Sequence, residues 1–298
     1  MRALRLRWVD ATLVTLSSRL LCFGLLSGTC KARGSMRTVK SVLELQEGGM
    51  PHFLHLCTQQ AENADSVALG ATMAEQAKEG DLFIFDKGCE ARQRLRVLAQ
   101  KRAFFLTPHG QQGLRIYQEL FCAANTTLPG HAPQKQEAPF VVLRVQTGVF
   151  ASPSTPAQAP SGWEDLPLVL IQGARYDSRT KQWTCLTLMT NLAYDPATKR
   201  VGGFTFEEVM ELYRRRWDIE ILFKFLKQHL SYSHLTSRSE KGIQVMIYMS
   251  LIAALLLIWF QRQTRIDRGW RSVKFWLAET VRQWTQQVLL QALHPLRC

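Results

Sequence analysis

The sequence predicts an α/β protein built on a mixed β-sheet with crossover helices. Its first hundred residues alternate strand-like and helix-like patterns in the order β-β-β-α-β-α-β, and this order requires crossover connections. Prolines punctuate the middle third between short β-rich runs, and helical patterns dominate the last third. A chain of 298 residues, 46% of them hydrophobic, can bury a sizeable core and fits one large domain or one domain with an insert.

Three consecutive strands are predicted at the start of the chain. Leu4 to Val14 alternates apolar and polar residues at first, which predicts a strand with Asp10 late along its length. Arg37 to Gln46 and Pro51 to Thr58 are also strand-like, and the Glu-Gly-Gly run at 47–49 predicts a hairpin turn between them. We therefore expect a meander.

Two helices and two further strands follow this meander. Asp65 to Lys78 predicts a helix that its first residue can cap. The run from Asp81 to Gly88 has the apolar centre of a buried strand, and its tip carries Asp86 into a glycine-containing turn. Ala91 to Gln100 predicts a second helix, and Ala103 to Leu106 predicts the next strand.

The middle of the chain predicts an inserted, mainly β subdomain. Short β-rich runs stand at Phe140 to Val145, Leu168 to Gln172 and Trp183 to Met189, and Ala151 to Gly162 predicts a flexible loop. The expected organisation is a first part of the core at 1–107, the insert at 108–203, and the remainder of the core with C-terminal helices at 204–298.

A charged helix is predicted where the core resumes. Thr205 and Glu208 have the spacing of a capping box, and we expect one helix through the stretch from Tyr213 to Lys227. At about 100° per residue, one narrow arc of this helix collects an aromatic, one carboxylate and several cations: Tyr213, Arg216, Glu220, Lys224 and Lys227. Two interpretations stay open at this point, a solvated face with i,i+4 ion pairs or a metal-assisted phosphodiester site.

Two more helices are predicted near the C-terminus. Trp270 to Leu293 predicts an amphipathic helix, and Ile243 to Phe260 is nearly all apolar. Eighteen residues stand at the low edge of the length that spans a membrane, so a buried core helix fits this run at least as well. We expect a soluble protein, with a membrane protein that spans at Ile243 to Phe260 as the alternative.

Charge indicates the kind of partner. The chain has 37 basic and 24 acidic residues, a net charge of +13, which favours a polyanion, although a membrane surface also satisfies the charge. The seven cysteines show no CxxC pair, so reduced, mostly structural thiols are expected. His52 and His55 stand in a strand-like run, where imidazoles that pack are commoner than metal ligands.

Three carboxylates distant in sequence can meet in this fold. Asp10 and Asp86 are expected on neighbouring strands, and Glu220 on a helix that can cover the same sheet. Such carboxylates repel each other unless a cation is present. Their oxygen ligands suit two Mg²⁺ ions, with Mn²⁺ as a substitute, better than zinc.

The spacing Tyr213-x2-Arg216-x3-Glu220-x6-Lys227 resembles the Tyr-Arg-Glu-Lys signature of bacterial insertion-sequence transposases of the insertion sequence 4 type. Asp10-Ala-Thr-Leu and Phe-Asp86-Lys-Gly resemble the first and second acids of that family. The resemblance covers essentially residues 4–293. It implies an RNase H-like core with a β insert before the helix that carries the third acid.

The resemblance also implies a function. Transposases of this family cut DNA at transposon ends and join the freed 3′-hydroxyl to target DNA through a metal-bound Asp-Asp-Glu triad, here Asp10, Asp86 and Glu220. The implied DNA-binding residues are Tyr213, Arg216, Trp217, Lys224, Lys227 and Lys87, of which Trp217 supports the motif by packing. Trp183 is a candidate for the tryptophan that stabilises a flipped base. The implied partners are double-stranded DNA and a second copy of the chain in a synaptic dimer, in the bacterial cytoplasm.

Two features depart from the family pattern. Lys87 stands where the family carries Arg after the second acid, which keeps the charge without bidentate contact to phosphate. Full-length relatives carry a DNA-recognition region before the first acid, whereas Asp10 stands almost at the start of this chain. We therefore expect a start codon set too far downstream or a truncated product. The alternatives to a transposase are an inactive DNA-binding remnant and an RNase H-like nuclease.

Overall fold

The computed structural model describes residues 4–16, 24–26, 37–89, 92–110, 113–123, 140–150, 166–177, 180–230 and 239–264, and residues 232, 235, 237, 279, 282, 283 and 285. The chain divides into two compact units, Met1–Ala11 with Val42–Ile219, and Thr12–Ser41 with Glu220–Cys298. The loop predicted at 151–162 lies outside the described residues, as does most of the helix predicted at 270–293.

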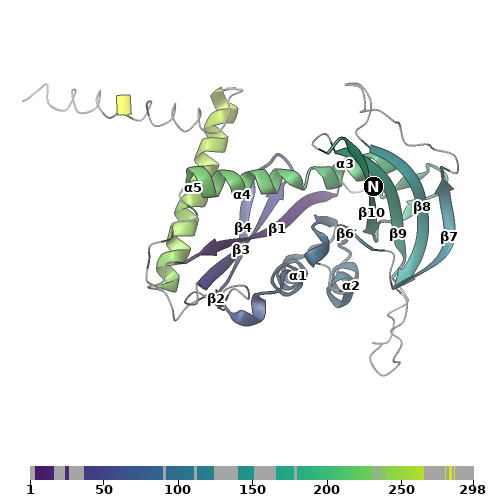
Figure 1. The fold of residues 1–298 in the computed structure, drawn as a ribbon, viewed down its shortest axis with the longest axis horizontal. Coiled ribbons are helices and arrows are strands. Elements are labelled where there is room, and N and C mark those ends of the chain that lie inside the picture. Colours follow the sequence, from purple (N-terminus) through teal and green to yellow (C-terminus); the bar gives the residue numbers. More distant parts are fainter. Residues whose placement is uncertain are drawn as a thin grey trace, which may run out of the picture. The chain divides into compact units, whose positions relative to one another are not determined.

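The strands form a mixed sheet (Figure 1). They are β1 (Arg5–Thr15), β2 (Leu25–Leu26), β3 (Arg37–Gln46), β4 (Pro51–Cys57), β5 (Asp81–Ile84), β6 (Phe104–Pro108), β7 (Leu114–Cys122), β8 (Phe140–Phe150), β9 (Leu168–Asp177) and β10 (Gln182–Thr190). Their order is β2-β3-β1-β5-β6-β10-β9-β8-β7, with β4 paired to β3. Because β1, β5 and β6 are parallel whereas β10 runs antiparallel to β6, the predicted mixed sheet is confirmed.

The helices are α1 (Asp65–Gln76), α2 (Arg92–Gln100), α3 (Phe206–Arg214), α4 (Trp217–His229) and α5 (Glu240–Thr264), with short 3₁₀ turns η2 (Gln60–Glu62) and η3 (Lys87–Cys89). Helices α1 and α2 are the predicted crossovers and lie side by side (Figure 1). Asp65 is the first residue of α1 and not its cap, which is Ala64.

Helices cover both faces of the sheet in the first unit. On one face, strand residues including Val9 and Phe83 form a core with Leu69 of α1 and Leu95 of α2. The neighbouring residue Trp8 points the other way, and its indole nitrogen donates a hydrogen bond of 2.8 Å to the carbonyl oxygen of Leu212 in α3. Because successive side chains of a strand alternate between faces, Asp10 belongs to the face of Trp8 and α3.

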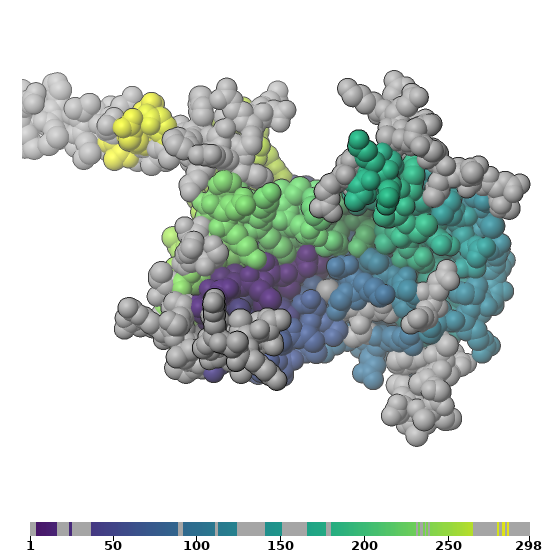
Figure 2. Space-filling model, in the orientation of Figure 1, coloured from purple at the N-terminus to yellow at the C-terminus, as the bar shows by residue number. Residues whose placement is uncertain are grey.

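The region between β6 and α3 is mainly β and continues the same sheet. Strand β10 pairs with β6 from Leu188↔Pro108 to Thr190↔Leu106, and β9, β8 and β7 follow outward by antiparallel pairing. The residues of these strands, blue to teal, gather on one side of the first unit (Figure 2). A short pair of strands, β11 (Tyr194–Asp195) and β12 (Arg200–Val201), precedes α3. The structure confirms the predicted fold class as far as an α/β protein with a mixed sheet flanked by helices, in which β-strands precede the helix of Glu220.

The insert also departs from the predicted strands. Strands β8 and β9 extend well beyond the predicted runs, and β7 was not predicted at all. Most side chains of β7 are exposed, and the apolar alternation of Leu114 and Ile116 is broken at Gln118. The division at 107/108 and 203/204 stays a prediction.

The single helix predicted through Tyr213 to Lys227 is wrong, because α3 ends at Arg214 and α4 begins at Trp217. The predicted capping box at the start of α3 is confirmed, with the amide of Glu208 bonded to the Thr205 hydroxyl at 3.2 Å. Between the helices the amide of Arg216 bonds to the carbonyl of Tyr213 at 3.0 Å, an i→i−3 bond that tightens the turn.

The second unit contains β2 and α5. Strand β2 pairs with β3 through Leu25↔Thr38, and the Ser250 hydroxyl of α5 donates a hydrogen bond of 3.1 Å to the carbonyl of Leu230. Helix α5 is long and apolar enough to cross a membrane. The sequence analysis favoured a buried core helix, but only 33% of the most apolar window of α5 is buried. An exposed apolar stripe explains the difference: Val245, Tyr248, Met249, Ile252, Leu256 and Trp259.

Candidate active site

Two aspartates occupy equivalent positions on neighbouring parallel strands. Strands β1 and β5 pair in register from Arg5↔Asp81 to Trp8↔Ile84, and Asp10 and Asp86 each stand two residues past the last pair. The sequence analysis placed Asp10 late on its strand, but β1 continues to Thr15. The strand that ends here is β5, so Asp86 is at a strand tip and Asp10 lies beside it on a continuing strand.

The backbone holds one oxygen of each carboxylate. The Oδ1 atom of Asp10 accepts a hydrogen bond of 2.8 Å from the amide of Ala11, and Oδ1 of Asp86 accepts one of 2.8 Å from the amide of Lys87. This local bond restricts rotation of each carboxylate, and Oδ2 of Asp10 then faces Arg216.

Arg216 lies against Asp10. Its Nη1 atom is 3.2 Å from Asp10 Oδ2, and the two side chains are only 13% and 21% exposed. The pair joins residues 206 positions apart in sequence. Such partial burial screens the attraction less than full exposure to solvent would. The arginine of the predicted signature, Arg216, therefore pairs with Asp10, the first predicted acid.

Tyr213 lies against Asp86 and Arg216. Burial raises the pKa of Tyr213 to about 12; Arg216 acts in the opposite direction, and the charge and hydrogen bond of Asp86 add to the rise. The phenol therefore keeps its proton at neutral pH and donates it in the hydrogen bond to Asp86. The Arg216 guanidinium also lies 5.8 Å from the centre of the Tyr213 ring.

The tight turn between α3 and α4 positions these two side chains. Trp8 fixes the end of α3 through its bond to Leu212, and the guanidinium of Arg215 lies over the Trp8 ring at 4.7 Å from its centre. Because Trp8 and Asp10 share one face of β1, the anchor brings the turn over the aspartates. The structure therefore unites four predicted site residues within the first unit: Asp10, Asp86, Tyr213 and Arg216.

The structure places four more predicted site residues on η3 and α4. Lys87 follows Asp86 and is exposed. Glu220, Lys224 and Lys227 lie on the part of α4 that belongs to the second unit. Glu220 is half-buried, Lys224 is exposed, and burial lowers the pKa of Lys227.

The two predicted tryptophans have different surroundings. Trp217 was expected to support the motif by packing, but its side chain is 57% exposed, because as the first residue of α4 it follows the tight turn. Trp183 is half-buried on β10 and makes an edge contact with Tyr176 at 5.5 Å between ring centres. Its role at a flipped base stays a prediction.

The donor atoms at the paired aspartates suit a hard cation. Carboxylate oxygens are the ligands that Mg²⁺ and Mn²⁺ prefer, and two acids at one register position need a positive charge between or beside them. In the structure Arg216 supplies positive charge to Asp10. The residues present therefore fit a divalent metal site.

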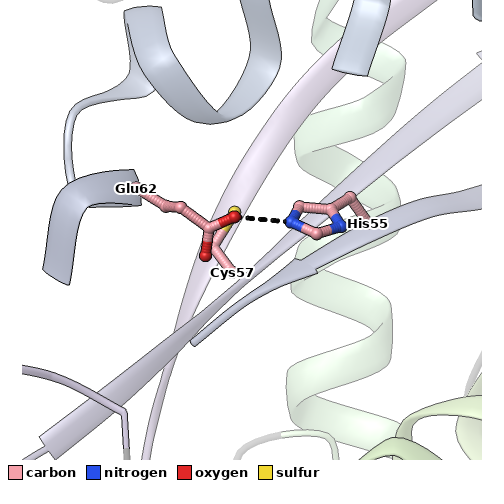
Figure 3. Close-up of side chains that lie close together, drawn as sticks. All are labelled: His55, Cys57 and Glu62. Atoms are coloured by element: carbon pink, nitrogen blue, oxygen red, sulfur yellow. Dashed lines mark hydrogen bonds and ion pairs between the residues drawn. The ribbon is translucent and has the colours of Figure 1, made fainter. Parts of the chain in front are cut away.

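A second group of potential metal ligands was missed by the sequence analysis. His55, Cys57 and Glu62 bring one ligand atom each to within 4.8 Å of one another (Figure 3). Burial raises the pKa of Glu62, but hydrogen bonds from His55, Gln59 and Thr58 outweigh this and hold it below its usual value. The available signal was the His-x-Cys spacing, because residues i and i+2 of a strand share a face.

Comparison with known proteins places the chain among transposases. The family described as "Transposase DDE domain" matches residues 2–256. A protein of Sinorhizobium fredii named as transposase y4zB is 26% identical over 263 residues, which are 88% of this chain and 62% of that protein. A Synechocystis protein named as a transposase for insertion sequence element IS4SA is 41% identical over 70 residues, 24% of this chain and 20% of that protein.

A solved structure is also similar over much of the chain. It is the cryo-EM structure of the piggyBac transposase synaptic complex with hairpin DNA, with a TM-score of 0.44 and 6% identity over 90% of this chain and 50% of that one. The chain thus spans less than two thirds of the length of each of these three proteins.

Proposed function

The chain belongs to the transposase DDE domain family, and on this premise we propose that it carries out cut-and-paste transposition of an insertion sequence. In this reaction DNA is cleaved at the element's ends, and the freed 3′-hydroxyl attacks target DNA. The observation that supports the proposal most directly is the meeting of Asp10 and Asp86 with Arg216 and Tyr213, because a site for phosphodiester chemistry needs carboxylates for a cation and basic groups for the DNA backbone.

Metal ligation is assigned to three carboxylates, Asp10, Asp86 and Glu220, consistent with the use of divalent metal by this family. Two Mg²⁺ ions, when bound, supply activation of the attacking oxygen and stabilisation of the leaving oxygen, and Mn²⁺ can substitute. The amides of Ala11 and Lys87 restrict the two aspartates beforehand, which reduces the conformational freedom lost on binding.

Arg216 and Tyr213 have separate tasks in this proposal. Arg216 balances the charge of Asp10, and its guanidinium would be available to a phosphate near the cleaved end if a bound cation balanced that charge instead. Tyr213 keeps its proton and orients Asp86 through their hydrogen bond. The basic residues Lys87, Lys224 and Lys227 add positive charge along the DNA backbone.

Trp217 is assigned to the DNA surface and not to the core, because its side chain is exposed. An aromatic ring in this position can stack on an unpaired base. The proposed assembly is a homodimer that holds two element ends in the bacterial cytoplasm. The net charge of +13 supports a DNA partner.

The test is cleavage of labelled duplexes that carry the element's terminal repeats, with Mg²⁺ or Mn²⁺. We expect nicks and strand transfer that Glu220→Gln abolishes while DNA binding persists, because the variant removes a metal ligand and no phosphate contact. Glu207→Gln, an exposed carboxylate on α3, is the matched control and should cleave normally. Binding without cleavage by the unaltered chain would instead support an inactive DNA-binding remnant, and nicking without strand transfer would support a nuclease.

A further inference from the structure

Three potential metal ligands lie within eight consecutive residues, away from the aspartate pair in sequence. His55 and Cys57 are on the same face of β4, and Glu62 ends the η2 turn that follows (Figure 3). Their ligand atoms lie within 4.8 Å of one another. Only small side-chain rotations are needed to bring such atoms around one ion of about 2.0–2.3 Å ligand distance.

Glu62 is held in a fixed orientation. Its Oε2 atom accepts hydrogen bonds from the amides of Thr58 at 3.0 Å and Gln59 at 3.2 Å. Its Oε1 atom is directed at Nε2 of His55, 2.8 Å away. Capping of the turn thus uses one oxygen and leaves the other toward the imidazole and the thiol.

Cys57 forms the inner side of the cluster. Its side chain is fully buried and belongs to the hydrophobic core that also contains Leu69 of α1. The other two ligands are partly open to solvent, with 43% exposure for His55 and 26% for Glu62. An ion can therefore enter from the side of His55 and Glu62 and meet the thiol at the back.

We propose that His55, Cys57 and Glu62 bind a transition-metal ion of the Zn²⁺ type, with the fourth position open to water. A thiolate, an imidazole and a carboxylate favour Zn²⁺ or Co²⁺ over Mg²⁺. On binding, the Cys57 thiol releases its proton to solvent, and neutral His55 moves its proton from Nε2 to Nδ1 so that Nε2 can ligate. One thiolate and one carboxylate then balance the two charges of the ion.

The bound ion would fasten β4 to the turn that leads into α1. The turn η2 contacts α1, and α1 contributes to the core of the first unit. An ion that binds only the folded protein raises its stability by mass action. The bound ion thus stabilises the connection between β4 and α1, and this stabilisation does not depend on the proposed transposition chemistry.

Cobalt titration of the full chain, freed of metal with a chelator under reducing conditions, tests the site. We expect one equivalent of Co²⁺ to produce a thiolate-to-cobalt charge-transfer band and the intense visible bands of a tetrahedral site. Cys57→Ser should abolish the charge-transfer band, and His55→Gln and Glu62→Gln should each weaken Co²⁺ binding by at least about 10-fold, the scale that even outer partners of a metal site reach.

Matched controls separate this cluster from other groups. His52→Gln changes an exposed histidine on the same strand, Cys185→Ser changes an exposed thiol on β10, and Asp86→Asn removes a carboxylate of the proposed active site. All three should keep the band. The proposal is overturned if the unaltered chain gives no band, or if the band persists in Cys57→Ser. Should Cys57→Ser fail to fold by circular dichroism, unchanged Co²⁺ affinity in both His55→Gln and Glu62→Gln overturns it.

Discussion

The two ends of the β1–β5 strand pair both combine aspartate with arginine, but they differ in how completely the charges are enclosed. At the first end, Asp81 is 3% exposed and bonds to Arg5 at 2.8 Å, to Arg7 at 2.9 Å and to the amide of Lys78 at 3.0 Å. At the second end, Asp10 is 21% exposed and Asp86 is open to solvent.

The enclosed end also satisfies its arginine. Arg7 bonds Glu44 at 2.6 Å as well as Asp81, and its guanidinium lies 4.5 Å from the centre of the Phe83 ring. These contacts pair Arg7 with Glu44 and Asp81 inside the protein, whereas Asp10 and Asp86 keep access to solvent. The difference indicates that the first end stabilises the fold, and it supports the proposal that the second end binds a metal ion and performs chemistry.

The largest expected effect is on catalysis. Asp86→Asn should slow metal-dependent cleavage by at least about 100-fold, since a bound metal contributes several kcal/mol to transition-state stabilisation. The free energy of unfolding should change by only about 1 kcal/mol or less, because the residue is exposed. Cleavage rate and urea unfolding are measured together. Asp81→Asn is the control, and a larger loss of stability from Asp86→Asn than from Asp81→Asn would contradict the comparison.

The next effect is on stability. Arg7→Met leaves two buried carboxylates without their shared cation and should lower the free energy of unfolding by about 3–5 kcal/mol. The measurement is the urea midpoint with its slope. Arg5→Met serves as control, because Arg5 is 55% exposed and its removal should lower the free energy by about 1 kcal/mol or less. Equal losses for both variants would show that the burial of Arg7 is not what matters.

A smaller effect is expected on DNA binding. Arg216→Ala should weaken binding and reduce the slope of log affinity against log salt by about one unit, the change for one lost phosphate contact. Arg214→Ala removes the same charge from an arginine that pairs with Glu211 on the surface of α3. The slope should fall less in Arg214→Ala, and an unchanged slope in Arg216→Ala would exclude its contact with DNA.

The smallest effect concerns alkaline pH. The pKa of Tyr213 is about 12 in the folded protein and ordinarily about 10, so its contribution to stability is complete below about pH 10 and is lost as pH rises toward 12. Tyr213→Phe should remove one late-titrating phenol from the ultraviolet titration of the folded chain. Tyr232, whose pKa burial also raises to about 12, remains as the internal reference. A Tyr213→Phe titration identical to that of the unaltered chain would contradict the assignment.

Much of the fold could be predicted because local patterns carry it. The alternation in β1, the glycine turn between β3 and β4, and the capping box of α3 are each encoded within a few residues. The neighbouring positions of Asp10 and Asp86 follow from the parallel pairing of β1 with β5, although only β5 ends there.

The features that the sequence did not predict depend on contacts between distant residues, or on backbone hydrogen bonds that leave no signal in the local composition. The tight turn at Arg215 and Arg216 contains no glycine or proline, and i→i−3 bonds distinguish it from a continuous helix. The Arg216–Asp10 pair spans 206 positions, whereas the spacing on the helix alone favoured ion pairs of Glu220 with Arg216 and Lys224. The ligand cluster at Cys57 depends on a turn that folds Glu62 back on the strand.

The turn between α3 and α4 gives three consecutive arginines three different partners. Arg214 bonds Glu211, Arg215 covers the ring of Trp8, and Arg216 reaches Asp10. Deletion of any one of them would remove a single positive charge. It would also change the register of the other two, so that they no longer face their partners. The position of each arginine therefore matters more than their total charge. We expect this segment to tolerate a substitution better than a deletion or an insertion.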